Sequence, residues 1–305
     1  MSLARKSQAL ALAAAAMLFA AMPGSASAQA VGCQLAVESG AEQWLIRYDP
    51  FDEDAADGEF DVAVVNRGEG PCNVSARVEL RGEQFGLMAD AGGQRLDYAL
   101  VDERGGADVT PRAGNSARRI GARSLALAPG ERGLLRFSFS VAPSEVPSAG
   151  LYSQRAYLSL ETGDGRLLAE KPVALGLEVP AVAVMGLKGE LRRGRGGAAT
   201  IDLGDLKAGR QNLRASLYVL STAGYSVSVR SENRGRLRQG SSDWYVPYDL
   251  SLGERSMDLA RGARFEIVSR VARLDDYALA IDVESIAGKR AGDYSDTLTF
   301  TVAAL

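Results

Sequence analysis

The residue types that most often carry out catalysis are scarce in this sequence. It contains no histidine, which removes the usual general base, the commonest metal ligand and any ordinary Ser-His-Asp or Cys-His arrangement. Catalysis by carboxylates or by a Ser–Lys pair would need a signature, and the sequence shows none. We therefore expect no enzyme, no catalytic residue, no metal site and no cofactor, and a secreted hydrolase is disfavoured.

The first 28 residues have the pattern of a secretory signal peptide. Arg5 and Lys6 give a positive start, residues 9–22 form a short apolar core, and Ala26-Ser27-Ala28 is a small-residue cleavage signal. The alternative is an uncleaved membrane anchor. No later stretch is long and apolar enough to span a bilayer, so we expect an exported protein.

Cys33 and Cys72 are the only cysteines. In an exported protein an even pair most simply forms one disulfide. The alternative is two buried free thiols.

Three short stretches could contact a ligand or a surface. The acidic run "DPFDEDAADGE" (residues 49–59) suggests calcium but lacks the EF-hand spacing, so a solvated loop is the alternative. The basic run "LRRGRGG" (191–197) could contact an anionic polymer or be a solvated loop. In "EQFGLMADAGG", Phe85, Leu87 and Met88 could form an apolar contact loop at a domain tip, or a strand end in the core. The net charge of −3 implies no nucleic-acid partner.

The sequence after residue 30 is almost wholly strand-like. The segments "EFDVAVVN", "NVSARVEL", "GLLRFSFSV", "YSVSVR" and "TLTFTV" alternate apolar and polar residues and are separated by Gly-, Pro- and Asn-rich turns. Short strands with regular turns predict an all-β fold of sandwich or barrel type. Trp44 and Trp244 lie in such strand-like contexts, and we expect both in the core.

One motif occurs twice. "SAGLYSQRAYLSL" (residues 148–160) aligns with "RAGDYSDTLTFTV" (290–302), and both copies contain Ala-Gly-x-Tyr-Ser followed by a strand. Because side chains alternate across a strand, Leu298, Phe300 and Val302 should point inward. Their equivalents in the first copy are Ala156, Leu158 and Leu160.

The two copies of the motif lead into different segments. After Leu160 come the turn signal "ETGDG" and a further strand, "RLLAEKPVALGLEV". After Val302 come only three residues. We therefore expect a self-complete sandwich over residues 29–180 and a second one over 181–305 that lacks its last strand. Such an edge exposes backbone groups and a core, and donor-strand complementation by another chain would cover both.

The second half resembles a known family. The segment "AGDYSDTLTFTV", preceded by "YSVSVRSENRGRLRQ" and "WYVPYDLSL", is similar to the end of the spore coat protein U family, which includes subunits of archaic chaperone–usher pili. "ATIDLGDL" (199–206) resembles an early strand of that family. The resemblance covers most of residues 181–305, although family domains usually carry a disulfide and this half has no cysteine. "GCQLAV", "YDPFD" and "GPCNVSARVEL" give the first half a weaker resemblance.

The resemblance implies two immunoglobulin-like domains in a pilus tip adhesin. Only residues 29–32 lie between the expected cleavage site and Cys33, so we expect a subunit that accepts a strand in a groove lined by Leu298, Phe300 and Val302 but donates none. The implied partners are a periplasmic pilus chaperone, an outer-membrane usher, an adjacent pilin subunit and an unknown surface or receptor. The protein would pass through the periplasm to the cell surface of a Gram-negative-type bacterium. The alternative is a periplasmic pilus-assembly chaperone, which "FDVAVVNRG" resembles, or another secreted β-sandwich envelope protein.

Overall fold

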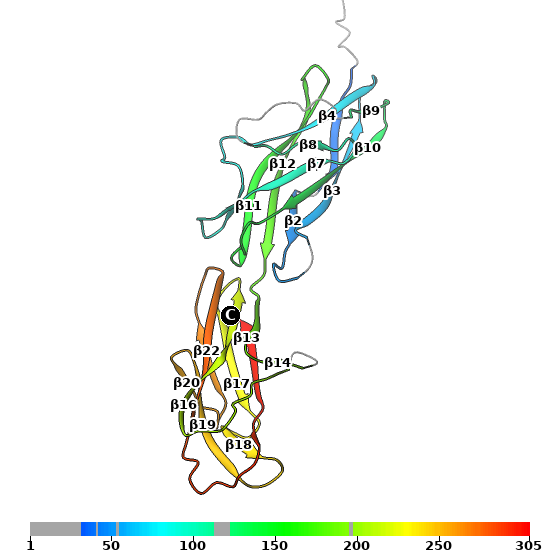
Figure 1. The fold of residues 1–305 in the computed structure, drawn as a ribbon. Helices are drawn as coiled ribbons and strands as arrows, with labels where there is room; N and C mark the ends of the chain where they lie inside the picture. Colours follow the sequence, from blue (N-terminus) through cyan, green and yellow to red (C-terminus); the bar gives the residue numbers. More distant parts are fainter. Residues whose placement is uncertain (1–31, 41, 53–54, 113–122, 195–197) are drawn as a thin grey trace, which may run out of the picture.

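The computed structural model describes residues 32–40, 42–52, 55–112, 123–194 and 198–305. The expected signal peptide lies outside the described residues. The described chain forms strands, turns and loops without a helix, which confirms the predicted all-β class. It is elongated, with β1–β12 at one end and β13–β24 at the other (Figure 1). Nowhere in these ranges is there a helix long and apolar enough to cross a membrane.

The first half is built from two sheets. Their strands are β1 (Leu35–Gly40), β2 (Gln43–Arg47), β3 (Asp57–Asn66), β4 (Cys72–Glu79), β5 (Leu87–Ala89), β6 (Arg95–Leu96), β7 (Tyr98–Asp102), β8 (Ala107–Asp108), β9 (Leu125–Leu127), β10 (Arg132–Val141), β11 (Gly150–Glu161) and β12 (Leu167–Val179). One sheet has the order β1-β3-β10-β7-β8 and the other has β2-β12-β11-β4-β9, with β5 pairing β11 and β6. β12 therefore lies inside its sheet, antiparallel to β11 and parallel to β2.

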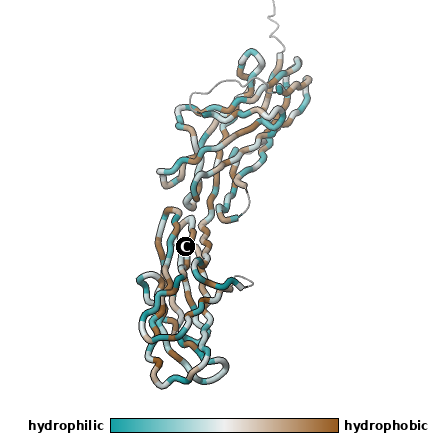
Figure 2. Tube along the Cα trace, in the orientation of Figure 1, coloured by the Kyte–Doolittle hydropathy of each residue, from teal (hydrophilic) through white to brown (hydrophobic). Residues whose placement is uncertain are grey.

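The core of the first half lies between these sheets. Val62 and Phe137 from one sheet pack with Leu158 and Leu175 from the other, and all four are buried. Trp44 is part of the same core, with its ring stacked 5.4 Å from that of Phe60. Apolar and polar residues alternate along these strands (Figure 2). This alternation is expected in a sandwich, because one face of each sheet packs on the core and the other is exposed to water.

The second half also contains two main sheets. Its strands are β13 (Ala183–Gly189), β14 (Arg192–Arg193), β15 (Ala199–Thr200), β16 (Gly209–Ser221), β17 (Tyr225–Ser231), β18 (Arg236–Gln239), β19 (Tyr245–Leu252), β20 (Arg255–Met257), β21 (Ala263–Ile267), β22 (Arg273–Val283), β23 (Tyr294–Ser295) and β24 (Leu298–Ala304). The larger sheet has the order β13-β16-β22-β19-β18-β23, and the smaller has β21-β17-β24. Leu217 and Ile281 of the larger sheet share a core with Val227 and Val229 of the smaller one.

The chain passes from one half to the other at Pro180. The side chain of Thr222 holds this crossing, because its hydroxyl donates to the Pro180 carbonyl and accepts from the Val182 amide. The Ala149 amide donates to the Thr222 carbonyl at 2.8 Å, and the Ala272 amide donates to the Ser148 hydroxyl at 3.0 Å. These bonds join the residues before β11 to the turn after β16 and to the residue before β22. That residues 29–180 fold alone and residues 181–305 do not stays a prediction.

Candidate functional site

The last strand of the chain has a partner on one side. β24 pairs with β17 over its whole length, from Ser231 opposite Leu298 to Tyr225 opposite Ala304. No strand in the described ranges pairs with its other side. The backbone N–H and C=O groups on that side of β24 therefore have no ladder partner in the described chain.

A second unpaired edge lies beside the first. β13 pairs with β16 on one side and is likewise the outermost strand of its sheet. β13 and β24 approach each other, with Cα atoms within 8 Å in places, but do not pair. A strand inserted between two others separates them by about 9.5 Å, which is twice the spacing in a sheet. We call these two free sides the acceptor edges; a strand entering between them has to move them apart.

The side chains at the acceptor edges are incompletely covered. Leu298, Phe300 and Val302 point toward the second core, as expected, but are only half-buried. Their equivalents in the first half are Ala156, Leu158 and Leu160, which are 0 %, 1 % and 0 % exposed. The half-buried residues of β13 that face the same core are Ala183, Met185 and Leu187.

The deeper burial of Ala156, Leu158 and Leu160 in the first half is due to β12. In the first half this strand pairs with β11 and contributes the buried side chains of Val173, Leu175, Leu177 and Val179 to the core. The described part of the second half has no strand in the corresponding place beside β24. The unpaired backbone and the partly covered core therefore occur together.

The geometry of the repeated motif is the same in both halves. Gly150 and Gly292 have φ values of 138° and 146°, which side chains of L-residues rarely allow. The Tyr152 hydroxyl donates to the carbonyl four residues earlier at 3.0 Å, and the Tyr294 hydroxyl does the same at 2.8 Å. The two halves can therefore be compared residue by residue along β11 and β23–β24.

Asp296, the residue after the repeated Tyr-Ser, ties the start of β24 to the larger sheet. Its carboxylate accepts hydrogen bonds from the Ser231 hydroxyl at 2.5 Å, the Tyr248 hydroxyl at 2.6 Å and the Asn233 backbone N–H at 3.0 Å. It also accepts from the Thr297 amide at 2.8 Å. We call this group the Asp296 clasp. In the first half Gln154 takes the same position.

The Gln154 side chain makes an equivalent set of bonds. Its carbonyl oxygen accepts from the Gly86 amide at 3.1 Å and from the Tyr98 hydroxyl at 3.0 Å, and its amide donates to the Gln84 carbonyl. Sequence reasoning missed both residues as anchors. The available signal was a polar residue that comes directly after Tyr-Ser in each copy and precedes an apolar alternation.

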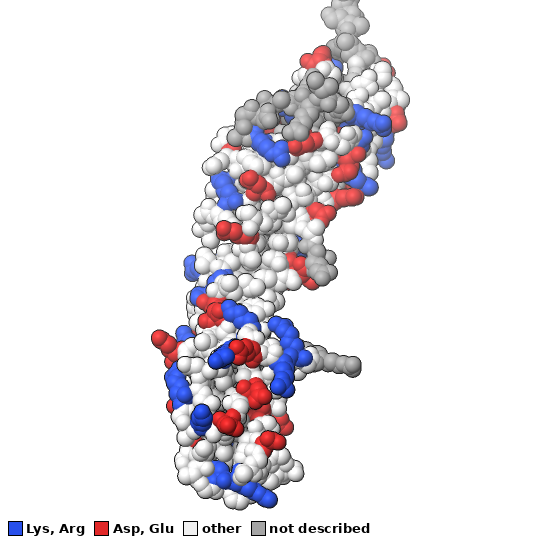
Figure 3. All heavy atoms as spheres, in the orientation of Figure 1, with Lys and Arg blue, Asp and Glu red and all other residues white. Residues whose placement is uncertain are grey.

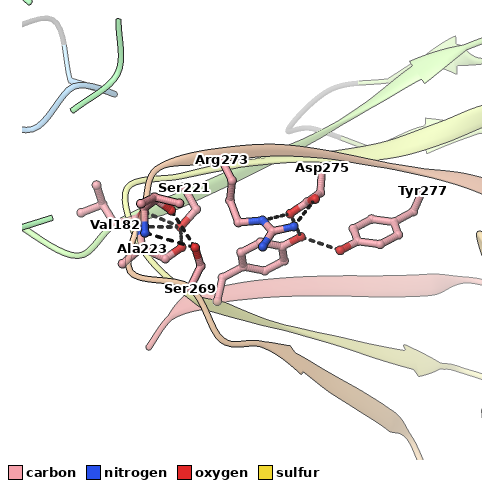
Figure 4. Close-up of polar contacts among 9 residues, drawn as sticks. Val182, Ser221, Ala223, Ser269, Arg273, Asp275 and Tyr277 are labelled. Atoms are coloured by element: carbon pink, nitrogen blue, oxygen red, sulfur yellow. Dashed lines mark hydrogen bonds and ion pairs between the residues drawn. The ribbon is translucent and has the colours of Figure 1, made fainter. Parts of the chain in front are cut away.

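A polar cluster braces the other end of β24, near the first half. Tyr225 pairs through its backbone with Ala304. Its hydroxyl donates to the Asp275 carboxylate at 2.6 Å and lies 2.5 Å from the Tyr277 hydroxyl. Arg273 donates to both carboxylate oxygens of Asp275 (Figure 4). That ion pair holds the pKa of Asp275 below its ordinary value. Burial, then the bond to Asp275, raises the pKa of Tyr225, so its hydroxyl stays protonated.

The disulfide predicted from the cysteine pair is present. Cys33 and Cys72 are joined, with their Cα atoms 4.9 Å apart and a sequence separation of 39. The bridge ties the segment before β1 to the start of β4.

Of the two alternatives for Phe85, Leu87 and Met88, the burial fits the strand end, and the expectation for Trp244 needs correction. Leu87 is fully buried in β5, Phe85 is half-buried with its ring 4.8 Å from that of Tyr98, and only Met88 is exposed. The three therefore do not form an exposed contact loop, and Leu87 is a strand end in the core. Trp244, expected in the core, is 43 % exposed. It lies just before β19 begins, where the alternation of the strand no longer determines its direction.

The structure shows no metal site in the acidic run and an exposed position for the basic run, within the residues that it describes. No group of three or more acidic or other metal-ligating side chains there could hold a metal ion. In the acidic run, residues 53–54 lie outside the described ranges, and Asp49 caps its own turn by accepting from the Phe51 amide. In the basic run, Arg192 and Arg193 are exposed on β14, and residues 195–197 are not described.

Comparison with known proteins identifies similar folds at low identity. No family model matches the chain, so its resemblance to the spore coat protein U family stays a prediction. No curated protein matches it either. Among solved structures, it is similar to a chain of the CsuC–CsuE complex of a chaperone and a tip subunit from archaic chaperone–usher Csu pili of Acinetobacter baumannii. The identity is 13 %, the match covers 88 % of this chain and 99 % of that one, and the TM-score is 0.47.

Two further structures come from enterotoxigenic Escherichia coli. CfaE, the adhesive subunit of the CFA/I fimbria, is 12 % identical over 84 % of this chain and 76 % of its own, with a TM-score of 0.32. The CooA pilin subunit is 12 % identical over 48 % of this chain and 97 % of its own, with a TM-score of 0.31. At TM-scores below 0.5 these similarities carry no weight for function, which has to be argued from the chain's own strand edges and side chains.

Proposed function

We propose that this chain is the tip adhesin of a chaperone–usher pilus. A strand from another protein inserts between the acceptor edges, and the first half, which has its own last strand, binds the surface to which the cell attaches. The observation behind this proposal is the coincidence of two neighbouring unpaired strand edges with half-buried core side chains on both, where the first half has β12.

An inserted strand would stabilise the second half in two ways. Each backbone N–H or C=O that gains a partner avoids a cost of about 1–3 kcal/mol if it is otherwise shielded from water. Alternate apolar side chains on the strand would cover Leu298, Phe300 and Val302 at about 25 cal/mol per Å² of apolar surface removed from water. Strand addition to an exposed edge is a common mode of protein recognition.

The proposal assigns successive partners to one site. In the periplasm a pilus chaperone supplies the strand and carries the subunit to an outer-membrane usher. In the fibre the N-terminal extension of the adjacent pilin replaces it. The surface or receptor that the first half binds is unknown.

The test is capture by a chaperone. The chain is co-expressed in the periplasm with a chaperone encoded beside its gene, and the complex is purified through a tag on the chaperone. We expect capture of the wild type, loss of at least tenfold with Phe300→Asp, and normal capture with Thr299→Asp, whose side chain lies on the exposed face of β24. Equal capture of the two variants, or no capture of the folded wild type, would refute the proposal.

A further inference from the structure

The pairing of β12 with β11 in the first half indicates in which direction a donor strand would run along β24. β12 runs antiparallel to β11, with Val173 opposite Ala156 and Leu177 opposite Tyr152. Transferred through the repeated motif, the residue that corresponds to Val173 would lie opposite Leu298. The one that corresponds to Leu177 would lie opposite Tyr294.

This direction determines where the two ends of the donor strand lie. β24 runs from Leu298 toward Ala304, and Ala304 lies at the end of the second half that faces the first (Figure 1). An antiparallel donor therefore begins near the first half and ends beyond Leu298, close to Tyr294. Because a donor extension precedes the globular part of its own subunit, that globular part would lie at the far end of the second half.

An exposed surface lies at that end, where Trp244 is 43 % exposed. Tyr294 pairs with Gln239 at the end of β18, and Trp244 projects from the turn that joins β18 to β19. The Arg238 side chain holds this turn by donating to the carbonyls of Ser242 at 2.8 Å and of Ser241 at 2.9 Å. Trp244 is thus presented on a turn that is already ordered.

Two further residues extend the surface. The Arg236 guanidinium, at the start of β18, lies 4.4 Å from the centre of the ring of Tyr245, the first residue of β19. The Ala291 carbonyl, in the loop that precedes Tyr294, accepts from the Gln239 side chain and joins that loop to β18. Lys and Arg side chains are visible at this end of the molecule on the face drawn in Figure 3. We call Arg236, Trp244 and Tyr245 the end surface.

We propose that the end surface is the docking site for the globular part of the donor subunit. This rests on the proposed function and adds a second contact, outside the acceptor edges. Trp, Tyr and Arg are the residue types that most often dominate binding at protein interfaces. Here all three occur on the β18–β19 hairpin, at the end of the second half where the donor strand would leave it. The partner surface should offer an apolar patch to the Trp244 ring and a carboxylate to Arg236.

The experiment compares two probes on the intact chain. One is the candidate pilin encoded beside this chain, with its N-terminal extension, and the other is a synthetic peptide of that extension alone. Trp44 is 1 % exposed, so Trp244 is the tryptophan that acrylamide can reach. We expect the whole pilin to protect Trp244 from quenching and the peptide to leave it quenchable, although both raise the melting temperature.

Affinity variants give an independent readout. Trp244→Ala and Arg236→Ala should each weaken binding of the whole pilin about tenfold or more, as hot-spot residues do, and change peptide binding less than twofold. Val268→Ala is the matched control, because Val268 is 87 % exposed in the loop before β22, at the opposite end. Circular dichroism checks that each variant is folded.

The outcomes separate the two proposals. If the peptide and the pilin both bind but Trp244 stays quenchable and the variants bind normally, the end surface is not a docking site and the acceptor edges stand. If neither probe binds the folded chain, the proposed function fails and this inference fails with it.

Discussion

Replacing Asp296 with alanine tests whether the clasp holds the start of β24. The change would remove the acceptor for the hydroxyls of Ser231 and Tyr248, which are 6 % and 5 % exposed as residues. A buried polar group left without its partner costs about 1–3 kcal/mol. Two such groups make about 3 kcal/mol a reasonable expectation for the loss in free energy of unfolding. With a guanidinium m-value of about 3 kcal/mol per M, the unfolding midpoint of the second half should fall by about 1 M.

Guanidinium unfolding followed by fluorescence can assign this loss to the second half. Trp244 lies in the second half and Trp44 in the first, so a Trp44→Phe background isolates the signal of the second half. Thr297→Ala is the matched control, because Thr297 is exposed and bonds to Asp296 through its backbone amide. A midpoint for Asp296→Ala that matches the control would mean that the clasp contributes nothing.

Three other outcomes are expected. Removing the disulfide should lower the free energy of unfolding of the first half by about 4 kcal/mol, the chain-entropy value for a separation of 39; denaturant unfolding of the double Cys→Ser variant measures it, and mass spectrometry without reductant should find no free thiol in the wild type. The bond from Arg273 lowers the pKa of Asp275 in the folded state. The ionised Asp275 carboxylate therefore stabilises the fold above pH about 4, and this stabilisation is lost as the pH falls below that value. Urea midpoints of the second half should decline less steeply in acid for Asp275→Asn than for the wild type. Expressed separately, residues 29–180 should unfold cooperatively and residues 181–305 should not, and a cooperative second half beside a disordered first half would reverse this assignment.

Much of the strand structure was predictable from local pattern. The alternation in "EFDVAVVN" places Val62 and Val64 in the core, and the inward direction of Leu298, Phe300 and Val302 obeys the same rule. The hairpin after the first copy of the motif was visible in its turn residues. The disulfide was predictable because Cys33 and Cys72 are the only two cysteines in the sequence.

Long-range contacts were not predictable in this way. The Asp296 carboxylate bonds to side chains 48 and 65 residues away, and no local pattern reveals such partners. The parallel pairing of β12 with β2 is equally remote in sequence. Trp244 was misplaced because strand alternation was extended to the residue before β19 begins.

The central claim is that a strand added between the acceptor edges completes the second half. A copy of residues 166–179, the strand that closes the first half, can be fused after Leu305 through a short flexible linker. The same segment in scrambled order serves as control.

Thermal unfolding of the fused protein is the most direct measurement. We expect a soluble monomer whose second half melts at least about 8 °C higher, which corresponds to about 2 kcal/mol or more for a unit of this size. Phe300→Asp should cancel that rise. An unfused chain that is already a stable monomer, with a melting temperature unchanged by the added strand, would contradict the account.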